Sequence, residues 1–345
     1  MKRLCNWSVG LCLAGCLTAP LLAAPVVLDT PALQNVRAER SAILGLARAG
    51  ERLVAVGERG TVLLSDDAGR SWRQAKVPVS VSLTAVQFVD AQRGWATGHL
   101  GVVLHSEDGG ETWHKQLDGI QAARLALAAA ESSGDQRLLD EARRLVQDGP
   151  DKPFLDLYFS DARRGFVVGA YNLILHTQDG GLSWQPWMSR LDNPSGLHLY
   201  AIRAQGENLF IAGERGLLLR STDAGNSFQA LASPYEGSFF GLLAGRGGEL
   251  LAFGLRGNAW LSQDSGEHWR ALPSPIQSSF VAGLALDDGR LLLASQDGEL
   301  VRVAQQSIEP LGRLSGSAIA SLAESAEGQL LGAGLGGVRA PLTIP

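Results

Sequence analysis

One motif recurs along the chain at intervals of about 40 residues and constrains the fold more than any other feature. Each copy has an apolar run, a Gly-x-x-Gly turn, a second apolar run and then Ser/Thr-x-Asp-x-Gly-x-Ser/Thr-Trp. Short apolar runs bounded by Gly, Asp and Ser are typical of β-strands, and these runs lack the period near 3.6 residues that helices need. Four short strands in a unit of this length indicate one blade of a β-propeller.

The number of copies predicts the size of the ring. The glycine that precedes the turn, or its equivalent, lies at positions 57, 98, 169, 213, 254, 294 and 334. Only the gap between 98 and 169 is longer, by about 30 residues. We therefore expect an all-β chain that forms a seven-bladed β-propeller of four-stranded blades over residues 25–345, with a helical insertion at 118–150.

Strand positions follow from the same pattern. In the second copy we expect strands at 83–88, 94–98, 102–105 and 112–114. The seventh copy has no recognisable fourth strand. The N-terminal segment Val26–Leu28 is the candidate to supply that strand and so to latch the ring, because closure of a propeller removes open sheet edges.

The Asp-containing element of the first five copies is the Asp box of bacterial neuraminidase repeats. We expect it on the turn between the third and fourth strands, where Asp accepts hydrogen bonds from turn amides, Gly adopts positive φ and the aromatic residue packs between blades. Catalysis by these carboxylates is the alternative, but five symmetric copies at the rim cannot converge on one substrate. The residues are Ser65, Asp67, Gly69, Trp72; Ser106, Asp108, Gly110, Trp113; Thr177, Asp179, Gly181, Trp184; Ser221, Asp223, Gly225, Phe228; and Ser262, Asp264, Gly266, Trp269.

The N-terminus has the order of a secretory signal. Basic residues at positions 2 and 3 precede an apolar segment that Pro20 and Pro25 interrupt, and we assign residues 1–24 to the signal. Two processing routes stay open: the run Leu-Ala-Gly-Cys at 13–16 resembles a lipobox in which Cys16 is lipidated, whereas cleavage near 21–24 would release a soluble protein. We expect a periplasmic or otherwise extracytoplasmic protein, soluble or lipid-anchored. All three cysteines lie in this segment, so no disulfide or thiolate nucleophile is expected in the mature domain.

The blade pattern resembles the photosystem II assembly (stability) factor family of seven-bladed propellers, over about residues 26–345. The best matches are Gly94–Gly98 with Asp108–Trp113, and Arg164–Gly169 with Asp179–Trp184. The Asp box alone is shared with sialidases, sortilin-like receptors and glucan-active enzymes. Seven blades, a secretory signal and no second domain favour the assembly-factor family. The resemblance implies a non-enzymatic scaffold that helps a membrane complex to assemble in an extracytoplasmic space.

Composition and chemistry exclude several other functions. The net charge of −5 argues against nucleic-acid binding, which needs a basic surface. A sialidase needs a Tyr nucleophile and three arginines for its substrate carboxylate, and the Arg motif that precedes the first box in sialidases is missing. We expect no enzyme activity, no cofactor and no metal, since the six histidines are scattered. A glycan-binding or sialidase-like, glycan-cleaving propeller remains the alternative.

The turns between the second and third strands hold the candidate binding residues. Arg occupies the same position of this turn in three copies, as Arg59, Arg215 and Arg256, and His99 and Tyr171 lie in the turns of the second and third copies. In a propeller these turns share one face with the connections between blades. Arg binds carboxylates and carboxy termini through paired hydrogen bonds, and the resembled family has an arginine-lined face associated with partner binding. The competing interpretation is a solvated residue or a local pair with a neighbouring glutamate of the turn.

The insertion is expected to be a helical hairpin. Asp118 and Asp135 stand at N-cap positions, a Ser-Ser-Gly sequence separates the two runs, and Gly149 with Pro150 ends the second. As a connection between blades it belongs on the face of the three arginines. There it either helps to dock a partner or only caps the propeller. The expected partner is a membrane protein or a membrane-complex subunit of the cell envelope, bound by a monomer.

Overall fold

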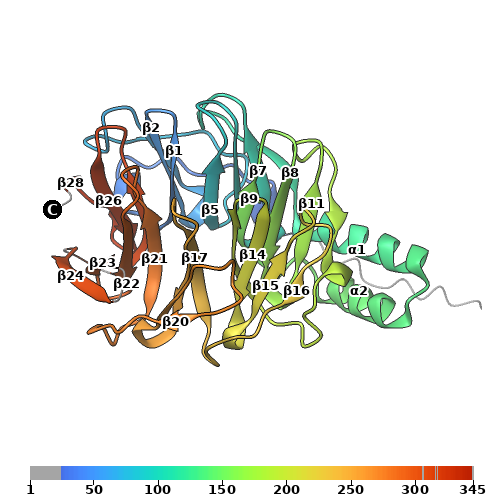
Figure 1. Ribbon diagram of the computed structural model, residues 1–345. Coiled ribbons are helices and arrows are strands. Elements are labelled where there is room, and N and C mark those ends of the chain that lie inside the picture. The colour runs from blue at the N-terminus through green and yellow to red at the C-terminus, as the bar shows by residue number, and fades with distance from the viewer. Residues whose placement is uncertain (1–24, 305–306, 315, 317, 344–345) are drawn as a thin grey trace, which may run out of the picture.

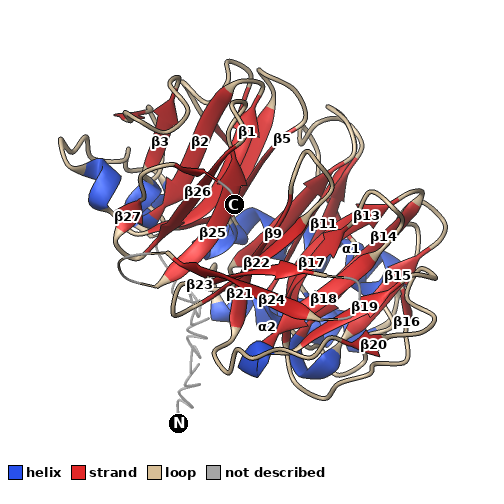
Figure 2. Ribbon diagram, turned by 60° about the vertical axis from the view of Figure 1, so that its left-hand side comes forward, coloured by secondary structure: helices blue, strands red, loops and turns tan. Residues whose placement is uncertain are grey.

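The computed structural model describes residues 25–304, 307–314, 316 and 318–343, so the signal segment and Cys16 lie outside the described residues. Within this part of the chain, seven antiparallel sheets stand around one centre (Figures 1 and 2). The expected seven-bladed β-propeller is confirmed. The blades are β1–β4 (Ile43–Ala49, Arg52–Gly57, Val62–Ser65, Arg73–Gln74), β5–β8 (Leu83–Phe88, Gly94–Gly98, Val103–Ser106, His114–Leu117), β9–β12 (Phe154–Phe159, Gly165–Gly169, Ile174–Thr177, Gln185–Pro186), β13–β16 (Leu199–Gln205, Asn208–Gly213, Leu218–Ser221, Gln229–Ala230), β17–β20 (Phe239–Ala244, Leu250–Gly254, Ala259–Ser262, Arg270–Ala271), β21–β24 (Phe280–Ala285, Leu291–Ser295, Glu299–Val303, Ile308–Arg313) and β25–β28 (Ile319–Glu324, Gln329–Gly334, Gly337–Val338, Leu342–Thr343). In the first six blades the strands are given from the innermost outward.

The second strand of each blade is buried because the two neighbouring blades cover its two faces. In β6 and β10 every residue is buried, and the pattern does not alternate; the buried Thr97 of β6 donates its hydroxyl to the Val102 carbonyl. The core is accordingly divided into clusters between neighbouring blades; one of them joins Val56 of blade 1 to Leu104 of blade 2. Strands β5 and β6 have the bounds expected from the sequence, and β7 and β8 begin slightly later than expected.

The Asp-box turns form closed hydrogen-bond networks. In the second box the Asp108 carboxylate accepts bonds from the Ser106 hydroxyl (2.8 Å), the Thr112 amide (3.0 Å) and the Thr112 hydroxyl (2.6 Å). The Gly110 amide donates to the Ser106 hydroxyl oxygen at 2.9 Å, and the Trp113 indole donates to the Gly110 carbonyl at 2.9 Å. The other four boxes repeat the carboxylate bonds, with His268 replacing the hydroxyl donor in the fifth.

These networks change the acid strength of the aspartates. The Ser71 hydroxyl, the Ser71 amide and the Ser65 hydroxyl lower the pKa of Asp67 to about 2. The backbone amide and ring of His268 do the same for Asp264, whose pKa is also about 2. The carboxylates therefore stay ionised far below neutral pH, and each is the acceptor that organises its own turn.

Each box also touches the blade that precedes it. The box glycine has φ between 84° and 89° in all five boxes, and it leaves room for a side chain of the neighbouring blade. A Cβ atom at Gly110 would press on Leu64 of blade 1, and one at Gly225 would collide with Phe166 of blade 3. The box is therefore both a turn and a contact between blades.

The ring closes without the strand expected from the N-terminus. Val26–Leu28 forms the short 3₁₀ helix η1, so that expectation is wrong. This segment binds the loop after β4 instead: the Ser80 amide donates to the Val27 carbonyl at 2.9 Å, and Leu28 is buried between blades 1 and 2. Blade 7 is completed by β27 and β28, which pair one after the other with the same strand, β26.

Blades 1 and 7 are joined by side-chain packing and by a hydrogen bond from the Leu46 amide of β1 to the Ser321 hydroxyl of β25 at 3.1 Å. Gly69 of the first box faces Leu331 on β26, as the other boxes face their neighbours. Trp72 and Leu53 pack with Leu331 and Ala323 in one cluster. A second short helix, η2 (Ala38–Arg40), lies against β27. Within the described residues, no strand is shared across this seam.

A helical hairpin leaves the ring between blades 2 and 3 (Figure 1). Helix α1 (Gly119–Ser133) and helix α2 (Gln136–Asp148) begin at N-caps Asp118 and Asp135, as the sequence indicated. Asp118 forms a capping box with Gln121, in which each side chain bonds the other residue's backbone amide. None of the helices in the described part of the chain is long and apolar enough to cross a membrane.

Two histidines pack against aromatic rings, His176 buried and His105 partly buried. His105 stacks on Trp95 at a centroid distance of 4.7 Å, and His176 stacks on Phe166 at 4.4 Å. His105 Nε2 and His176 Nδ1 have no hydrogen-bond partner among the described residues. Burial lowers the pKa of both side chains from the usual 6.5, because the charged imidazolium would lose its hydration.

We expect Asp108→Ala to lower the free energy of unfolding by about 2–3 kcal/mol, because it removes an ionised acceptor and leaves the Thr112 amide unsatisfied. Urea unfolding followed by tryptophan fluorescence measures this. Glu107→Ala, at an exposed position of the same turn, is the matched control and should change stability little. Equal stabilities for the two variants would contradict the structural role of the box.

We also expect stability to fall below pH 6.5. In the unfolded chain histidine binds a proton near pH 6.5, whereas in the folded protein His105 and His176 bind one only at lower pH. Their contribution to the free energy of unfolding is therefore complete above pH 6.5 and is lost as the pH falls. The double variant His105→Phe, His176→Phe should unfold with a weaker pH dependence between about pH 7.5 and about pH 5. His99→Phe, at an exposed histidine, should retain the wild-type dependence. Identical slopes for all three proteins would rule the mechanism out.

Candidate functional site

Five turns between second and third strands share one backbone conformation. They are the 3₁₀ turns η3 (Glu58–Gly60), η4 (His99–Gly101), η5 (Ala170–Asn172), η7 (Glu214–Gly216) and η8 (Leu255–Gly257). The middle residue of each is left-handed, with φ between 52° and 59°, although none of them is glycine. These residues are Arg59, Leu100, Tyr171, Arg215 and Arg256.

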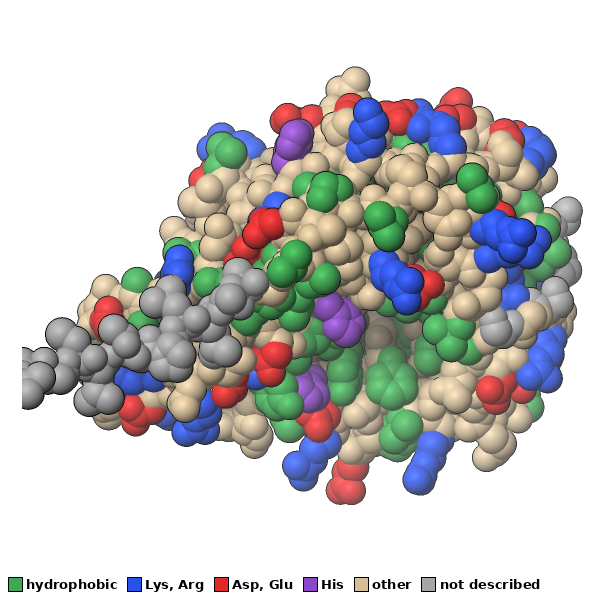
Figure 3. Space-filling view, turned by 180° about the vertical axis from the view of Figure 1, so that it is seen from behind, with side chains coloured by type: hydrophobic (Ala, Val, Ile, Leu, Met, Phe, Trp, Pro, Cys, Tyr) green, Lys and Arg blue, Asp and Glu red, His purple; other side chains and the backbone are tan. Residues whose placement is uncertain are grey.

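Loops between blades hold each of these turns. At η3, a Cβ atom on Gly57 would collide with the Ala42 carbonyl, and one on Gly60 would collide with the Val79 carbonyl. Ala42 belongs to the loop before β1 and Val79 to the loop before β5, so the turn is wedged between two inter-blade loops. The turns and these loops therefore occupy one face of the ring, which we call the turn face. Figure 3 shows this face with a hollow at its centre and with histidine and basic side chains around the hollow.

The three arginines project from the turn face with free guanidinium groups. Arg59, Arg215 and Arg256 are exposed, and within the described part of the chain none of their side chains makes a hydrogen bond or ion pair. They lie on blades 1, 4 and 5, so the second and third are on neighbouring blades and the first is across the ring.

The neighbouring glutamates do not pair with the arginines. Glu58 Oε1 accepts the Ala42 amide at 3.1 Å, and Glu214 Oε2 accepts the His198 amide at 3.2 Å. Both carboxylates therefore fix an inter-blade loop to its turn. The local Arg–Glu pair that competed with a binding role is not formed, and the arginines are left to solvent or to a ligand.

Tyr171 belongs to an aromatic contact at the edge of the turn face. Its side chain is 64% exposed, and its ring meets the His198 ring edge-on at a centroid distance of 4.5 Å. The Tyr171 amide donates to His198 Nδ1 at 2.8 Å, and Lys152 Nζ lies 5.2 Å from the centre of the Tyr171 ring. His99 is exposed on η4, and no side-chain contact places it in this group among the described residues.

A β-bulge near the start of every innermost strand adds residues that the sequence analysis missed. In each blade the register between first and second strands skips one residue next to the turn face. All seven skipped residues are partly exposed: Leu44, Thr84, Leu155, Tyr200, Phe240, Val281 and Ala320. Six of them are apolar or aromatic, so the innermost strands present a largely apolar surface beside the turn face.

Aromatic rings connect this surface to Tyr171. Tyr200 lies 6.1 Å from His198 and 5.7 Å from Phe240, measured between ring centroids. The path Tyr171–His198–Tyr200–Phe240 thus crosses from blade 3 to blade 5. The signal that could have revealed Tyr200 and Phe240 is their matched position, one residue into the first strand of successive repeats.

Tyr200, on this face, has a pKa that its surroundings shift. Burial, and then the negative charge of Glu214, raise the pKa of the Tyr200 hydroxyl. A tyrosine nucleophile needs a lowered pKa, because the phenolate is the reactive form. The Asp-box carboxylates are committed to their own turns. Free guanidinium groups beside apolar and aromatic side chains suit a ligand that has both a carboxylate and apolar groups.

Comparisons with known proteins agree with this fold. The family model for the photosynthesis system II assembly factor YCF48 matches residues 64–138 and 136–337. A photosystem II assembly lipoprotein Ycf48 of Synechococcus sp. strain CC9902 is 38% identical over 77 residues, which cover 22% of this chain and 23% of the relative. The photosystem II stability/assembly factor HCF136 of Arabidopsis thaliana is 27% identical over 119 residues, covering 32% of this chain and 30% of the relative. These matches span less than a third of each relative's length.

A solved structure extends the comparison to nearly the whole propeller. A protein described as YCF48 bound to D1 peptide superposes with a TM-score of 0.66 at 15% identity, over 91% of this chain and 96% of the other. At that identity the likeness concerns the fold alone.

We expect the left-handed turns to reverse the usual order of alanine and glycine. At most positions glycine is less stable than alanine, but at φ near 52° Arg215→Gly should be more stable than Arg215→Ala by about 1 kcal/mol. Urea unfolding of both variants measures the difference. A more stable alanine variant would show that the turn imposes no left-handed strain.

Proposed function

Since the chain belongs to the photosynthesis system II assembly factor YCF48 family, we propose that it is a non-catalytic assembly factor that binds the carboxy-terminal tail of a membrane protein outside the cytoplasm. The turn face is the proposed binding surface. Arg59, Arg215 and Arg256 bind carboxylate groups of the tail, and His99 and Tyr171 complete the surface. The partner is a membrane protein or a subunit of a membrane complex in the cell envelope.

The free arginines in left-handed turns carry this proposal. Glycine would adopt φ near 55° with less strain, yet three of the five turns hold an arginine there. Their guanidinium groups stabilise nothing within the described protein, so the chain gains no folding energy from them. A ligand that brings carboxylates gives these side chains hydrogen-bond acceptors.

The form of the ligand follows from the arrangement of charges. Arg215 and Arg256 lie on neighbouring blades and Arg59 lies across the ring, so one small anion fits this distribution poorly. An extended peptide with a terminal carboxylate and acidic side chains can reach several turns. The aromatic side chains of Tyr171, His198 and Tyr200 lie between blades 3 and 4 and provide apolar contacts along the way.

Two observations support a location outside the cytoplasm. The N-terminal segment has the order of a secretory signal, and it contains the lipobox-like run that ends at Cys16. One relative is described as a lipoprotein. We propose that the chain is exported and that Cys16 anchors it to the membrane surface, close to the partner.

Recovery of membrane proteins with a tagged chain tests the proposal. We expect the triple variant Arg59→Gly, Arg215→Gly, Arg256→Gly to lose at least roughly tenfold of the partner that wild type retains, because truncation of interface arginines is costly. Glycine is used because it suits the backbone of these turns, so the variant should fold. Quantitative mass spectrometry of detergent-solubilised host membranes is the measurement.

The matched control removes the same charge from the opposite face. Arg93, Arg163 and Arg246 are exposed on the turns between first and second strands, and their triple alanine variant should bind as wild type does. Equal loss in both variants would indicate a non-specific charge effect. Unchanged recovery in the glycine variant would refute the role of the turn face.

A further inference from the structure

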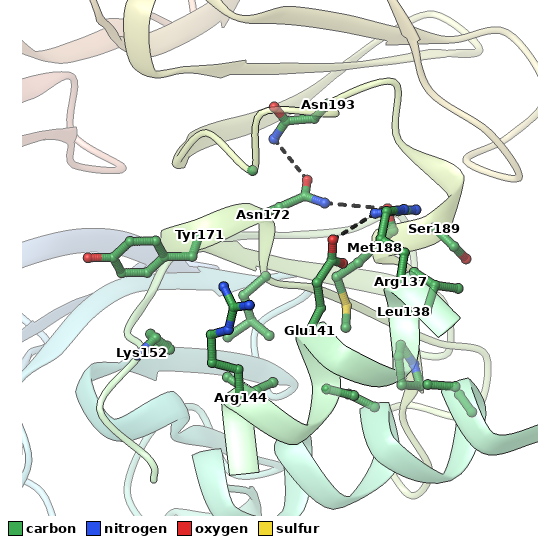
Figure 4. A pocket seen from close by; sticks show the side chains of 18 of the residues that line it. Arg137, Leu138, Glu141, Arg144, Lys152, Tyr171, Asn172, Met188, Ser189 and Asn193 are labelled. Atoms are coloured by element: carbon green, nitrogen blue, oxygen red, sulfur yellow. Dashed lines mark hydrogen bonds and ion pairs between the residues drawn. The ribbon is translucent and has the colours of Figure 1, made fainter. Parts of the chain in front are cut away.

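A groove separates the helical hairpin from the propeller and continues the turn face outward. It has a volume of about 590 Å³ and is lined by α1, α2, η5 and the loop after β12. Figure 4 looks into it, with residues of α2 on one side and Tyr171, Asn172 and Asn193 on the other. Grooves of this size are typical of ligand sites, and this one combines an apolar floor with charged side chains of α2.

The floor of the groove is apolar because the facing residues of the hairpin are small. Ala126, Ala130 and Ala142 are buried where the two helices meet, and they leave space that larger side chains would occupy. Leu138 and Leu145 complete the floor from α2.

Met188 closes the bottom of the groove on the propeller side. It lies in the 3₁₀ turn η6 (Met188–Arg190), is partly buried and packs with three clusters: the hairpin core and the cores on both sides of blade 3. Methionine adapts its shape readily, which suits a surface that receives apolar side chains. It is also the single methionine after Met1, so one side chain can report on the groove.

The charges of the groove leave one cation unpaired. Arg137 pairs with Glu141 at 2.8 Å, and Lys152 contacts Asp148 at 3.1 Å and Asp151 at 2.5 Å. Arg144 is exposed and has no ion pair within the described part of the chain. Figure 4 shows its guanidinium group pointing into the groove between Tyr171 and Glu141. The groove therefore complements an apolar ligand with one negative charge.

Tyr171 joins the groove to the turn face. It is the middle residue of η5, equivalent to the three free arginines, and its side chain lines the groove. On its other side it contacts His198, where the aromatic path toward Phe240 begins. A single extended peptide can thus lie on the turn face and continue past Tyr171 into the groove.

We propose that the groove binds an apolar segment of the same membrane-protein tail, upstream of its carboxy terminus, with an acidic residue of that segment opposite Arg144. This inference rests on the proposed function, which assigns the carboxy terminus to the turn face. The hairpin is then part of the binding site and selects partners by a second segment, in addition to the terminal carboxylate.

Site-specific photocrosslinking in the host cell tests the two parts separately. The photoreactive amino acid p-benzoylphenylalanine is placed, one position at a time, at Ala129 on the groove, at Glu236 on the turn face and at Ala128 on the outer side of α1. All three positions are exposed, and Ala128 is the matched control because it does not line the groove. We expect Ala129 and Glu236 to capture the same membrane protein, and Ala128 to capture none.

The identity of the captured peptides shows whether the groove inference fails alone or together with the proposed function. The Glu236 crosslink should map to the carboxy-terminal end of the partner, and the Ala129 crosslink to an apolar segment that precedes it. Capture at Glu236 without capture at Ala129, or capture of a different protein or of lipid at Ala129, would overturn the groove inference and leave the proposed function standing. No capture at either position would refute both.

A purified system then measures the contribution of the groove. The probe is a synthetic peptide with the sequence mapped at Ala129, added to full-length protein labelled with [methyl-¹³C]methionine. The Met188 methyl resonance should shift on titration. Ala129→Leu, which fills the groove, should weaken binding roughly tenfold or more, as expected when one apolar contact is lost, whereas Ala128→Leu should not. An unchanged Met188 resonance at saturating peptide would overturn the proposal.

Discussion

The Asp-box turn is the interaction on which the ring depends, because it satisfies two requirements with the same few atoms. Its carboxylate accepts the amide and hydroxyl groups that would otherwise be unsatisfied at the turn, as Asp108 does for Ser106 and Thr112. Its glycine then gives the preceding blade room to pack, as Gly225 does for Phe166. Each of the first five blades thus carries, within its own sequence, the means of contacting the blade before it.

This arrangement divides the polar groups between the two faces of the ring. On the Asp-box side, the ionised carboxylates accept hydrogen bonds from groups of their own turns. On the turn face, Glu58 and Glu214 hold inter-blade loops, but the arginines next to them remain free. The Asp boxes thus use their charges to stabilise the regular part of the repeat, whereas the arginines of the turn face are free for the binding role proposed above.

The features that could be predicted from the sequence are those with local causes. The period of the repeat determines the number of blades, alternating and continuous apolar runs determine β5 and β6, and Asp118 and Asp135 cap helices through their own side chains. The role of Val26–Leu28 could not be predicted, because a short apolar run fits a strand as well as it fits the buried contact that Leu28 makes. Nor could the groove, since it arises where two helices and η5 meet. The free state of Arg215 depends on Glu214 binding the His198 amide, which is a contact between distant segments.

The seam between the first and last blades has a consequence for the order of folding. Every other box can find its neighbour as soon as the preceding blade exists, because that blade is earlier in the chain. The first box must wait for Leu331, and the edge of that blade is completed only by Leu342 on β28. Until then Trp72 and Leu53 have no partner from blade 7, so a partly synthesised chain displays an apolar edge. We therefore expect the contact between the first and last blades to form last, so that the time for which this edge is exposed depends on how quickly the end of the chain arrives.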